Sequence, residues 1–167
     1  MIISNSTPLI YLAKIGRLHL LRDLFRKIII PLEVKQEVVD AGKKINKRDA
    51  FIIEKEIANG WIEVKENAKQ LDIPFDIHLG EKAVIALACT LNVKMVLIDE
   101  RAARVTALLH DLTPRGTLYV LIKSLERGLL TFESFLATID QLAQEGFRLQ
   151  EEVYTKVIRK ALELSKK

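Results

Sequence analysis

The feature that most constrains this chain is an alternation of short apolar runs with segments of helical periodicity. Such alternation is typical of a parallel sheet flanked by helices, an α/β fold. The predicted strands cover residues 1–4, 27–30, 61–64 and 94–98, with a further short strand near 112–114. Because crossovers between parallel strands are right-handed, the carboxyl ends of these strands meet at one edge of the sheet.

Helical patterns fill the connections between the apolar runs and continue after the last one. The predicted helices cover residues 8–14, 18–25, 32–40, 48–58, 81–91, 102–109, 117–127, 132–144 and 150–164. We expect an α/β domain over residues 1–128. Residues 129–167 are expected to form a C-terminal helical hairpin packed on that same domain.

Length and composition narrow the class of protein. A chain of 167 residues can bury a core without covalent staples, and its single cysteine rules out an internal disulfide framework. No signal peptide is recognisable, and no apolar run reaches the roughly 20 residues that span a bilayer. We therefore expect a cytoplasmic protein with no membrane association.

The first ten residues place the first candidate for a site. An apolar run of strand length is followed by Ser4-Asn5-Ser6-Thr7-Pro8 and then by helical periodicity. Proline suits the first turn of a helix, which makes Ser6 or Thr7 the expected cap. Asn5 then lies at the carboxyl end of the first strand, where open α/β sheets build their sites.

Three carboxylates fall at comparable places. Glu37 lies on the helix after the second strand, and Glu81 opens the helix before the fourth. Asp99 ends the most apolar strand, and Glu100 follows it. Gathered carboxylates repel one another, and their pKa values rise unless a cation compensates. Such hard oxygen ligands suit Mg²⁺ or Mn²⁺, which activate water and stabilise the leaving oxygen of a phosphodiester.

Each acid also has an ordinary structural explanation. The helix dipole favours Glu81 at a helix N-terminus, and Asp99 would serve as a cap for the next helix. Glu37 would pair with a lysine on its own helix. Their joint placement at one edge is what supports a site.

Basic residues supply candidate contacts to a polyanion. The net charge is +4, and Arg101 and Arg104 share a helix face just after Asp99. They would contact phosphate or pair with the nearby acids. Four further candidates, Lys43, Lys44, Lys47 and Arg48, form a basic run, and residues 147–167 hold six basic side chains against three acidic ones. Such runs are also typical of a solvated helix face.

The motifs follow one another in a distinctive order. They are Ser4-Asn5-Ser6-Thr7-Pro8-Leu9-Ile10 with Leu12-Ala13-Lys14-Ile15-Gly16, then Leu79-Gly80-Glu81, then Leu97-Ile98-Asp99-Glu100-Arg101-Ala102-Ala103-Arg104, then Gly116-Thr117. This set resembles the PIN-domain superfamily. Within it, the pattern is similar to prokaryotic PIN-like proteins related to VapC-type toxins.

The resemblance implies a three-layer α/β/α sandwich around a central parallel sheet of four to five strands. It also implies a Mg²⁺- or Mn²⁺-dependent ribonuclease site, with RNA as substrate. The family's acids map onto Glu37, Glu81 and Asp99, where they hold the metal and orient the attacking water. Thr117 and Glu100 would support them. VapC-type toxins are usually held by a small antitoxin, and many form homodimers.

Asn5 departs from the family, which has an Asp at this place. An amide oxygen can ligate Mg²⁺, but it brings no charge and cannot act as a base. Two functions remain: a toxin-type endoribonuclease using Asp99, Glu81, Glu37 and Asn5, or a catalytically weak or inactive module that binds RNA or a protein. A phospho-accepting receiver domain would need an acidic pair after the first strand, which Ser4-Asn5 does not supply.

Overall fold

A five-stranded, wholly parallel sheet lies at the centre of the computed structural model, which describes residues 1–67, 71–74 and 76–167. Its strands run in the order β3-β2-β1-β4-β5. They are β1 (Ile2–Ser4), β2 (Ile28–Pro31), β3 (Ile62–Lys65), β4 (Met95–Leu97) and β5 (Thr113–Arg115). The predicted parallel sheet is confirmed, and each strand lies within one residue of its predicted bounds.

The helices of the described residues follow the predicted order. They are α1 (Ser6–Lys14), α2 (His19–Phe25), α3 (Leu32–Lys35), the π-helical segment η1 (Gln36–Ala41), α4 (Gly42–Lys44), α5 (Arg48–Ala58), α6 (Leu79–Leu91), α7 (Arg101–Leu109), α8 (Thr117–Glu126), α9 (Phe132–Gln144) and α10 (Glu151–Ser165). No helix in this part of the chain has the length and apolarity to cross a membrane.

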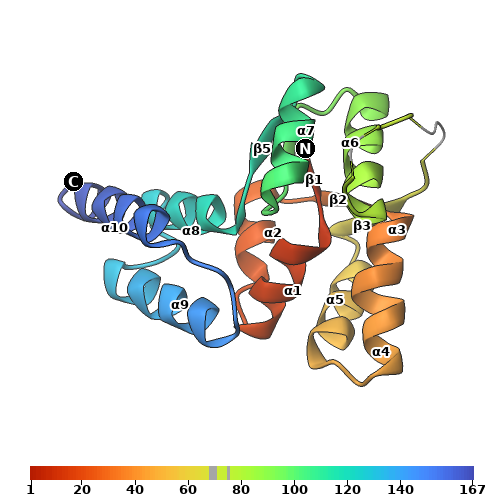
Figure 1. The fold of residues 1–167 in the computed structure, drawn as a ribbon. Coiled ribbons are helices and arrows are strands. Elements are labelled where there is room, and N and C mark those ends of the chain that lie inside the picture. The colour runs from red at the N-terminus through yellow and green to blue at the C-terminus, as the bar shows by residue number, and fades with distance from the viewer. Residues whose placement is uncertain (68–70, 75) are drawn as a thin grey trace.

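The helices form two layers around the sheet, which confirms the α/β/α architecture. Helices α6 and α7 lie on one side, and α1, α2, α5 and α8 lie on the other (Figure 1). Residues 83–88 of α6 are buried without interruption, because α6 packs on β1, β2 and β4. At the far side of the domain, α9 and α10 pack against α8 and each other.

Two local predictions need correction. The first helix begins at Ser6, so Asn5 and not Ser6 or Thr7 occupies the cap position. The chain turns into the helix directly after β1, which leaves no room for a longer loop. The predicted helix over residues 32–40 is also not uniform, because its middle is π-helical and it continues to Lys44. π-Helical segments occur often at functional sites, and this one contains Glu37.

The C-terminal helices share the core of the domain. Phe135 of α9 is fully buried, and it belongs to the same apolar cluster as the strands β1 and β2. By contrast, Ala161 is the one fully buried position described in α10. Helix α9 therefore contributes to the core, whereas α10 lies on its surface.

Replacing Phe135 with Ala tests whether residues 129–167 unfold together with the α/β domain. We expect a loss of about 3–5 kcal/mol in the free energy of unfolding, in a single transition, because the side chain leaves a large cavity. Urea unfolding followed by circular dichroism measures it. The control Phe51→Ala removes a half-exposed ring and should cost far less. Two separate transitions would instead show that the C-terminal helices unfold on their own.

Candidate active site at the carboxyl edge of the sheet

The candidate site lies where the strand order changes direction. From β1 the chain first adds β2 and β3 on one side, and it then returns to add β4 and β5 on the other. Open α/β sheets bind ligands in the crevice outside the carboxyl ends of strands at such a switch point. Asn5 follows β1 and Asp99 follows β4. The two strands are joined there by a backbone hydrogen bond, which the N–H of Asn5 donates to the carbonyl of Leu97 at 2.9 Å. The sheet thus brings these two predicted residues to adjacent strand ends.

Asp99 is held by the first residue of α8. Its Oδ1 accepts a hydrogen bond from the Thr117 amide at 2.8 Å, and its Oδ2 accepts one from the Thr117 hydroxyl at 2.7 Å. Gly116 permits this approach, because a Cβ at that position would lie 2.6 Å from Asp99 Oδ1. The predicted role of Asp99 as a helix cap is wrong, since Glu100 occupies the cap position of α7.

Glu37 and Asn5 approach each other from different elements. The Ser6 hydroxyl, at the start of α1, donates to Glu37 Oε2 at 2.7 Å. Both Glu37 Oε2 and Asn5 Oδ1 flank the α6 glycine Gly80, within 3.2 and 3.4 Å of where a Cβ would stand. Asn5 and Ser6 are buried, while Glu37 is exposed. The helix that follows β2 therefore carries its acid to the end of β1.

Glu81 is the most deeply buried of the acids. Only 3% of its surface is exposed, and its Oε2 accepts a hydrogen bond from the His78 amide at 2.9 Å. This bond satisfies the backbone N–H of His78, the cap residue of α6. Burial raises the pKa of Glu81, and the charges of Glu100 and Glu37 raise it further, against the lowering effect of His78.

The pKa of Asp99 is also raised. Burial is the main cause, the neighbouring Glu100 adds to it, and the bonds from Thr117 and the charge of Arg104 oppose it. Two carboxyl groups with raised pKa values at one edge of a sheet are typical of a functional site. The same pattern means that bringing a cation to this edge would relieve an unfavourable concentration of negative charge.

The four candidate side chains carry the types of oxygen atom that bind a hard divalent cation. Asp99, Glu37 and Glu81 offer carboxylate oxygens and Asn5 offers an amide oxygen, which are the ligands preferred by Mg²⁺ and Mn²⁺. The positions of the carboxylates favour a shared ion less. Within residues 1–67, 71–74 and 76–167, no three His, Cys, Asp or Glu side chains lie close enough together to hold one ion.

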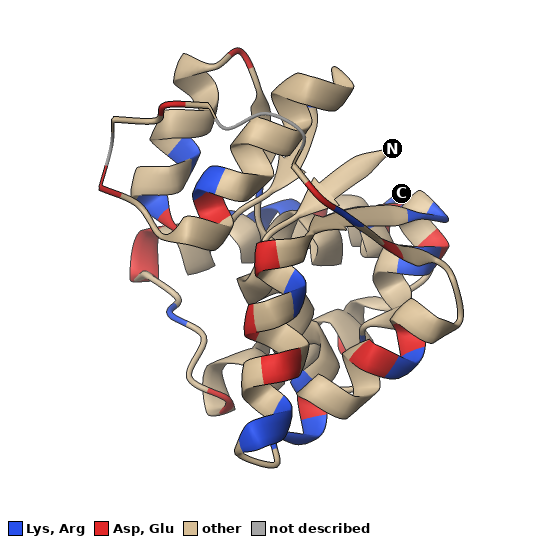
Figure 2. Ribbon diagram, turned by 90° about the vertical axis from the view of Figure 1, so that its right-hand side faces the viewer, with Lys and Arg blue, Asp and Glu red and all other residues tan. Residues whose placement is uncertain are grey.

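The predicted basic residues separate into two places. Arg101 and Arg104 lie beside Asp99, and Arg104 donates to the Ile98 carbonyl at 3.0 Å. Neither forms an ion pair within the described part of the chain, so the alternative of a salt bridge with the nearby acids is not seen there. Charged residues line the α3–α4 stretch, and α4 lies at its end away from the sheet (Figures 1 and 2).

The basic run at the end of that stretch is partly neutralised. Lys43 pairs with Glu54 at 2.7 Å. Lys44, Lys47 and Arg48 are exposed. Their predicted contact with nucleic acid would therefore take place away from the carboxylates.

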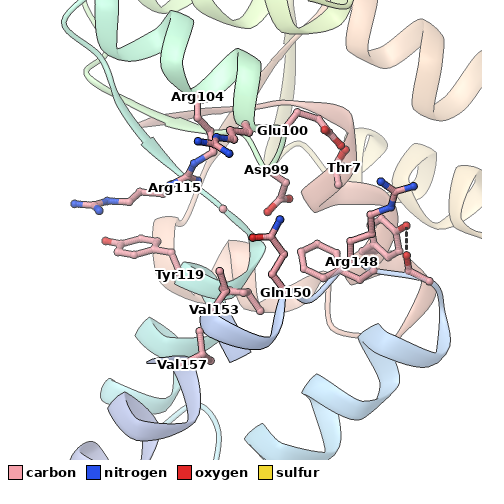
Figure 3. A pocket seen from close by; sticks show the side chains of 16 residues that line it. Thr7, Asp99, Glu100, Arg104, Arg115, Tyr119, Arg148, Gln150, Val153 and Val157 are labelled. Atoms are coloured by element: carbon pink, nitrogen blue, oxygen red, sulfur yellow. Dashed lines mark hydrogen bonds between the residues drawn. The ribbon is translucent and has the colours of Figure 1, made fainter. Parts of the chain in front are cut away.

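Sequence reasoning missed one side of the site. A cavity of about 660 Å³ adjoins Asp99 and is walled by Tyr11, Tyr119 and the segment 146–157 (Figure 3). The residues of the segment 146–157 are remote from Asp99 in sequence and belong to none of the motifs. The only signal was the basic excess in residues 147–167, which includes the pocket residue Arg148.

Comparison with known protein families agrees with this arrangement. A family model described as a PIN domain (DUF3368) matches residues 1–163. The chain belongs to the PIN-domain family. Searches of curated proteins and of solved structures gave no significant match. Membership of the PIN family suggests a nuclease-type function, RNA as ligand and a divalent metal ion as cofactor.

The raised pKa of Asp99 predicts how this PIN domain responds to pH without metal. The folded protein holds the Asp99 proton more tightly than the unfolded chain does, so ionisation of this group lowers stability as pH rises above about 4. Asp99→Asn removes that ionisation. We expect the variant to gain stability relative to the unaltered protein between pH 4 and pH 7, as measured by urea unfolding in EDTA.

The matched control for that experiment is Asp140→Asn, which changes an exposed carboxylate on α9. It removes a carboxylate that lies outside the candidate site. The prediction is contradicted if the stability difference between Asp99→Asn and the unaltered protein stays constant across this pH range.

Proposed function

We propose that this PIN domain is a Mg²⁺- or Mn²⁺-dependent endoribonuclease of the VapC toxin type, hydrolysing RNA phosphodiesters. The observation that carries the proposal is the arrangement at the switch point. Asp99, Glu81 and Glu37 lie around the ends of β1 and β4, and each accepts a hydrogen bond from Thr117, His78 or Ser6. Such donors fix the direction of a carboxylate, as the ligands of a reactive ion require.

In this proposal Asp99, Glu81 and Glu37 would hold the ion, with the Asn5 amide oxygen as an uncharged ligand. A bound Mg²⁺ or Mn²⁺ would lower the pKa of a water and neutralise charge on the phosphate. Thr117 fixes the orientation of Asp99, and Ser6 does the same for Glu37. The guanidinium of Arg104, which lies near Asp99, would contact a phosphate oxygen.

Assignment as a VapC-type toxin implies two protein partners. A small antitoxin would hold the protein inactive, and two copies of the chain would form a homodimer. Both proposals rest on the resemblance of the motifs around Asn5, Glu81 and Asp99 to VapC-type toxins. The basic residues Lys43–Arg48 are proposed as a more distant contact for RNA.

A second function is favoured by one observation, the buried amide at position 5. Asn5 is 4% exposed and lies at the carboxyl end of β1, where the family has a carboxylate. With one charge fewer, metal affinity would be weaker. The protein would then act as a catalytically weak or inactive module that binds RNA or a protein.

Cleavage of labelled RNAs distinguishes the two functions. We expect Mn²⁺- or Mg²⁺-dependent cutting that stops in EDTA and falls at least about a hundredfold in Asp99→Asn, because a charged ligand is lost while the shape is kept. Asp140→Asn is the control. Undiminished cleavage by Asp99→Asn would refute the assigned role of Asp99. Bound metal without any cutting would favour the binding module.

Asn5→Asp tests whether position 5 lines the metal site. We expect Mn²⁺ affinity to rise by about tenfold, because the variant adds a charged hard ligand next to Glu37 and Glu81. Isothermal titration calorimetry measures it. The matched control is Asn46→Asp, on an exposed turn far along the chain. Unchanged affinity in Asn5→Asp would place position 5 outside the metal site.

A further inference from the structure

The cavity beside Asp99 is built from three parts of the chain that are distant in sequence. One wall comes from α1, a second from the turns that open α7 and α8, and the third from the loop after α9 and the start of α10. Its lining includes Tyr11, Asp99, Arg104, Tyr119, Arg148 and Gln150. At about 660 Å³, it falls within the range of pockets that hold small organic ligands.

The charges around this cavity favour an anion. Four arginines line it, Arg101, Arg104, Arg115 and Arg148, against the two acidic residues Asp99 and Glu100. Within residues 1–67, 71–74 and 76–167, none of these arginines lies within ion-pair distance of a carboxylate. Arginines that form no ion pair within the described residues, arranged around one cavity, suit the oxygens of phosphate.

The same cavity carries aromatic surfaces. Phe147 meets the Tyr11 ring edge-on at 5.1 Å, and the Arg115 guanidinium lies 5.1 Å from the centre of the Tyr119 ring. Figure 3 shows Gln150 directed toward Asp99 from the opposite wall. Aromatic faces with arginines between them are a platform for nucleic-acid bases, and an amide side chain can donate and accept at a base edge or a sugar hydroxyl.

We propose that this pocket binds one unpaired nucleotide of a single-stranded RNA, next to the phosphodiester presented to Asp99. The inference deepens the nuclease proposal and rests on it for the position of the scissile bond. The arginines would hold the phosphates, and Tyr119 or Tyr11 would stack on the base. Only a base free of its helix can enter such a cavity, so the pocket would select single-stranded over duplex RNA.

The C-terminal segment gains a function in this proposal. Residues Phe147, Arg148 and Gln150 connect α9 to α10 and form the wall opposite to the sheet. The helices that follow the α/β layers would thus supply part of the substrate contact.

Binding of a fluorescein-labelled single-stranded hexaribonucleotide, followed by anisotropy in EDTA, tests the pocket without cleavage. We expect Arg148→Ala and Tyr119→Leu each to weaken binding by about tenfold, since each removes a phosphate contact or a stacking surface. Arg22→Ala is the matched control. It removes an exposed arginine of α2 that does not line the cavity, and it should leave the affinity within about twofold.

A duplex of the same sequence should compete at least about tenfold less well than the single strand. Thermal unfolding of Arg148→Ala should match that of the unaltered protein, because its side chain is exposed. Undetectable binding, equal competition by the duplex, or unchanged affinity in both Arg148→Ala and Tyr119→Leu would each overturn the inference.

A parallel cleavage assay with Mn²⁺ separates this inference from the proposed function. Metal-dependent cutting with unchanged binding in the two variants would retain the nuclease and refute the pocket. Weakened binding in the variants, with no cleavage under any metal, would retain the nucleotide pocket and refute the nuclease.

Discussion

The arrangement of this molecule depends on β1, the central strand of its parallel sheet. Ile2 and Ile3 are buried on both faces, and β1 pairs with β2 on one side and β4 on the other. Because all five strands are parallel, their carboxyl ends lie at the same edge of the sheet, and the turns that follow the strands begin there. The strand order changes direction at β1, and the ends of β1 and β4 are therefore adjacent. That single constraint places Asn5 near Asp99 and directs the first turns of α1, α7 and α8 toward the same crevice.

The carboxylates at this edge are kept in an electrostatically unfavourable setting. Burial raises the pKa of Glu81 and of Asp99, and the neighbouring Glu100 adds to both shifts. Hydrogen bonds from His78 and Thr117 offset part of that cost and fix the orientation of each group. Raised pKa values of this kind lower stability at neutral pH, which is the relation expected between stability and activity at functional sites.

The bond between Asp99 and Thr117 also links the site to the C-terminal helices. Thr117 begins α8, on which both α9 and α10 pack, and α9 inserts Phe135 into the core. The orientation of Asp99 is thereby coupled to the helices that bring Arg148 and Gln150 to the opposite wall of the pocket. The C-terminal segment is part of the core through α9 and part of the candidate substrate surface through its connection to α10.

Local pattern determined the strands, the order of the helices and the family, because apolar runs and turn residues act over a few positions. It also placed Asp99, Glu81, Glu37 and Asn5 at one edge, since parallel strands must end together. It could not determine the π-helical turn that contains Glu37, because a helical pattern does not fix the hydrogen-bond register.

The contact of Ser6 with Glu37 and the pocket wall around Arg148 were also beyond the sequence. Only the tertiary structure decided these contacts. They join residues far apart in the chain through packing, and no periodicity in the sequence carries information about which surfaces will meet.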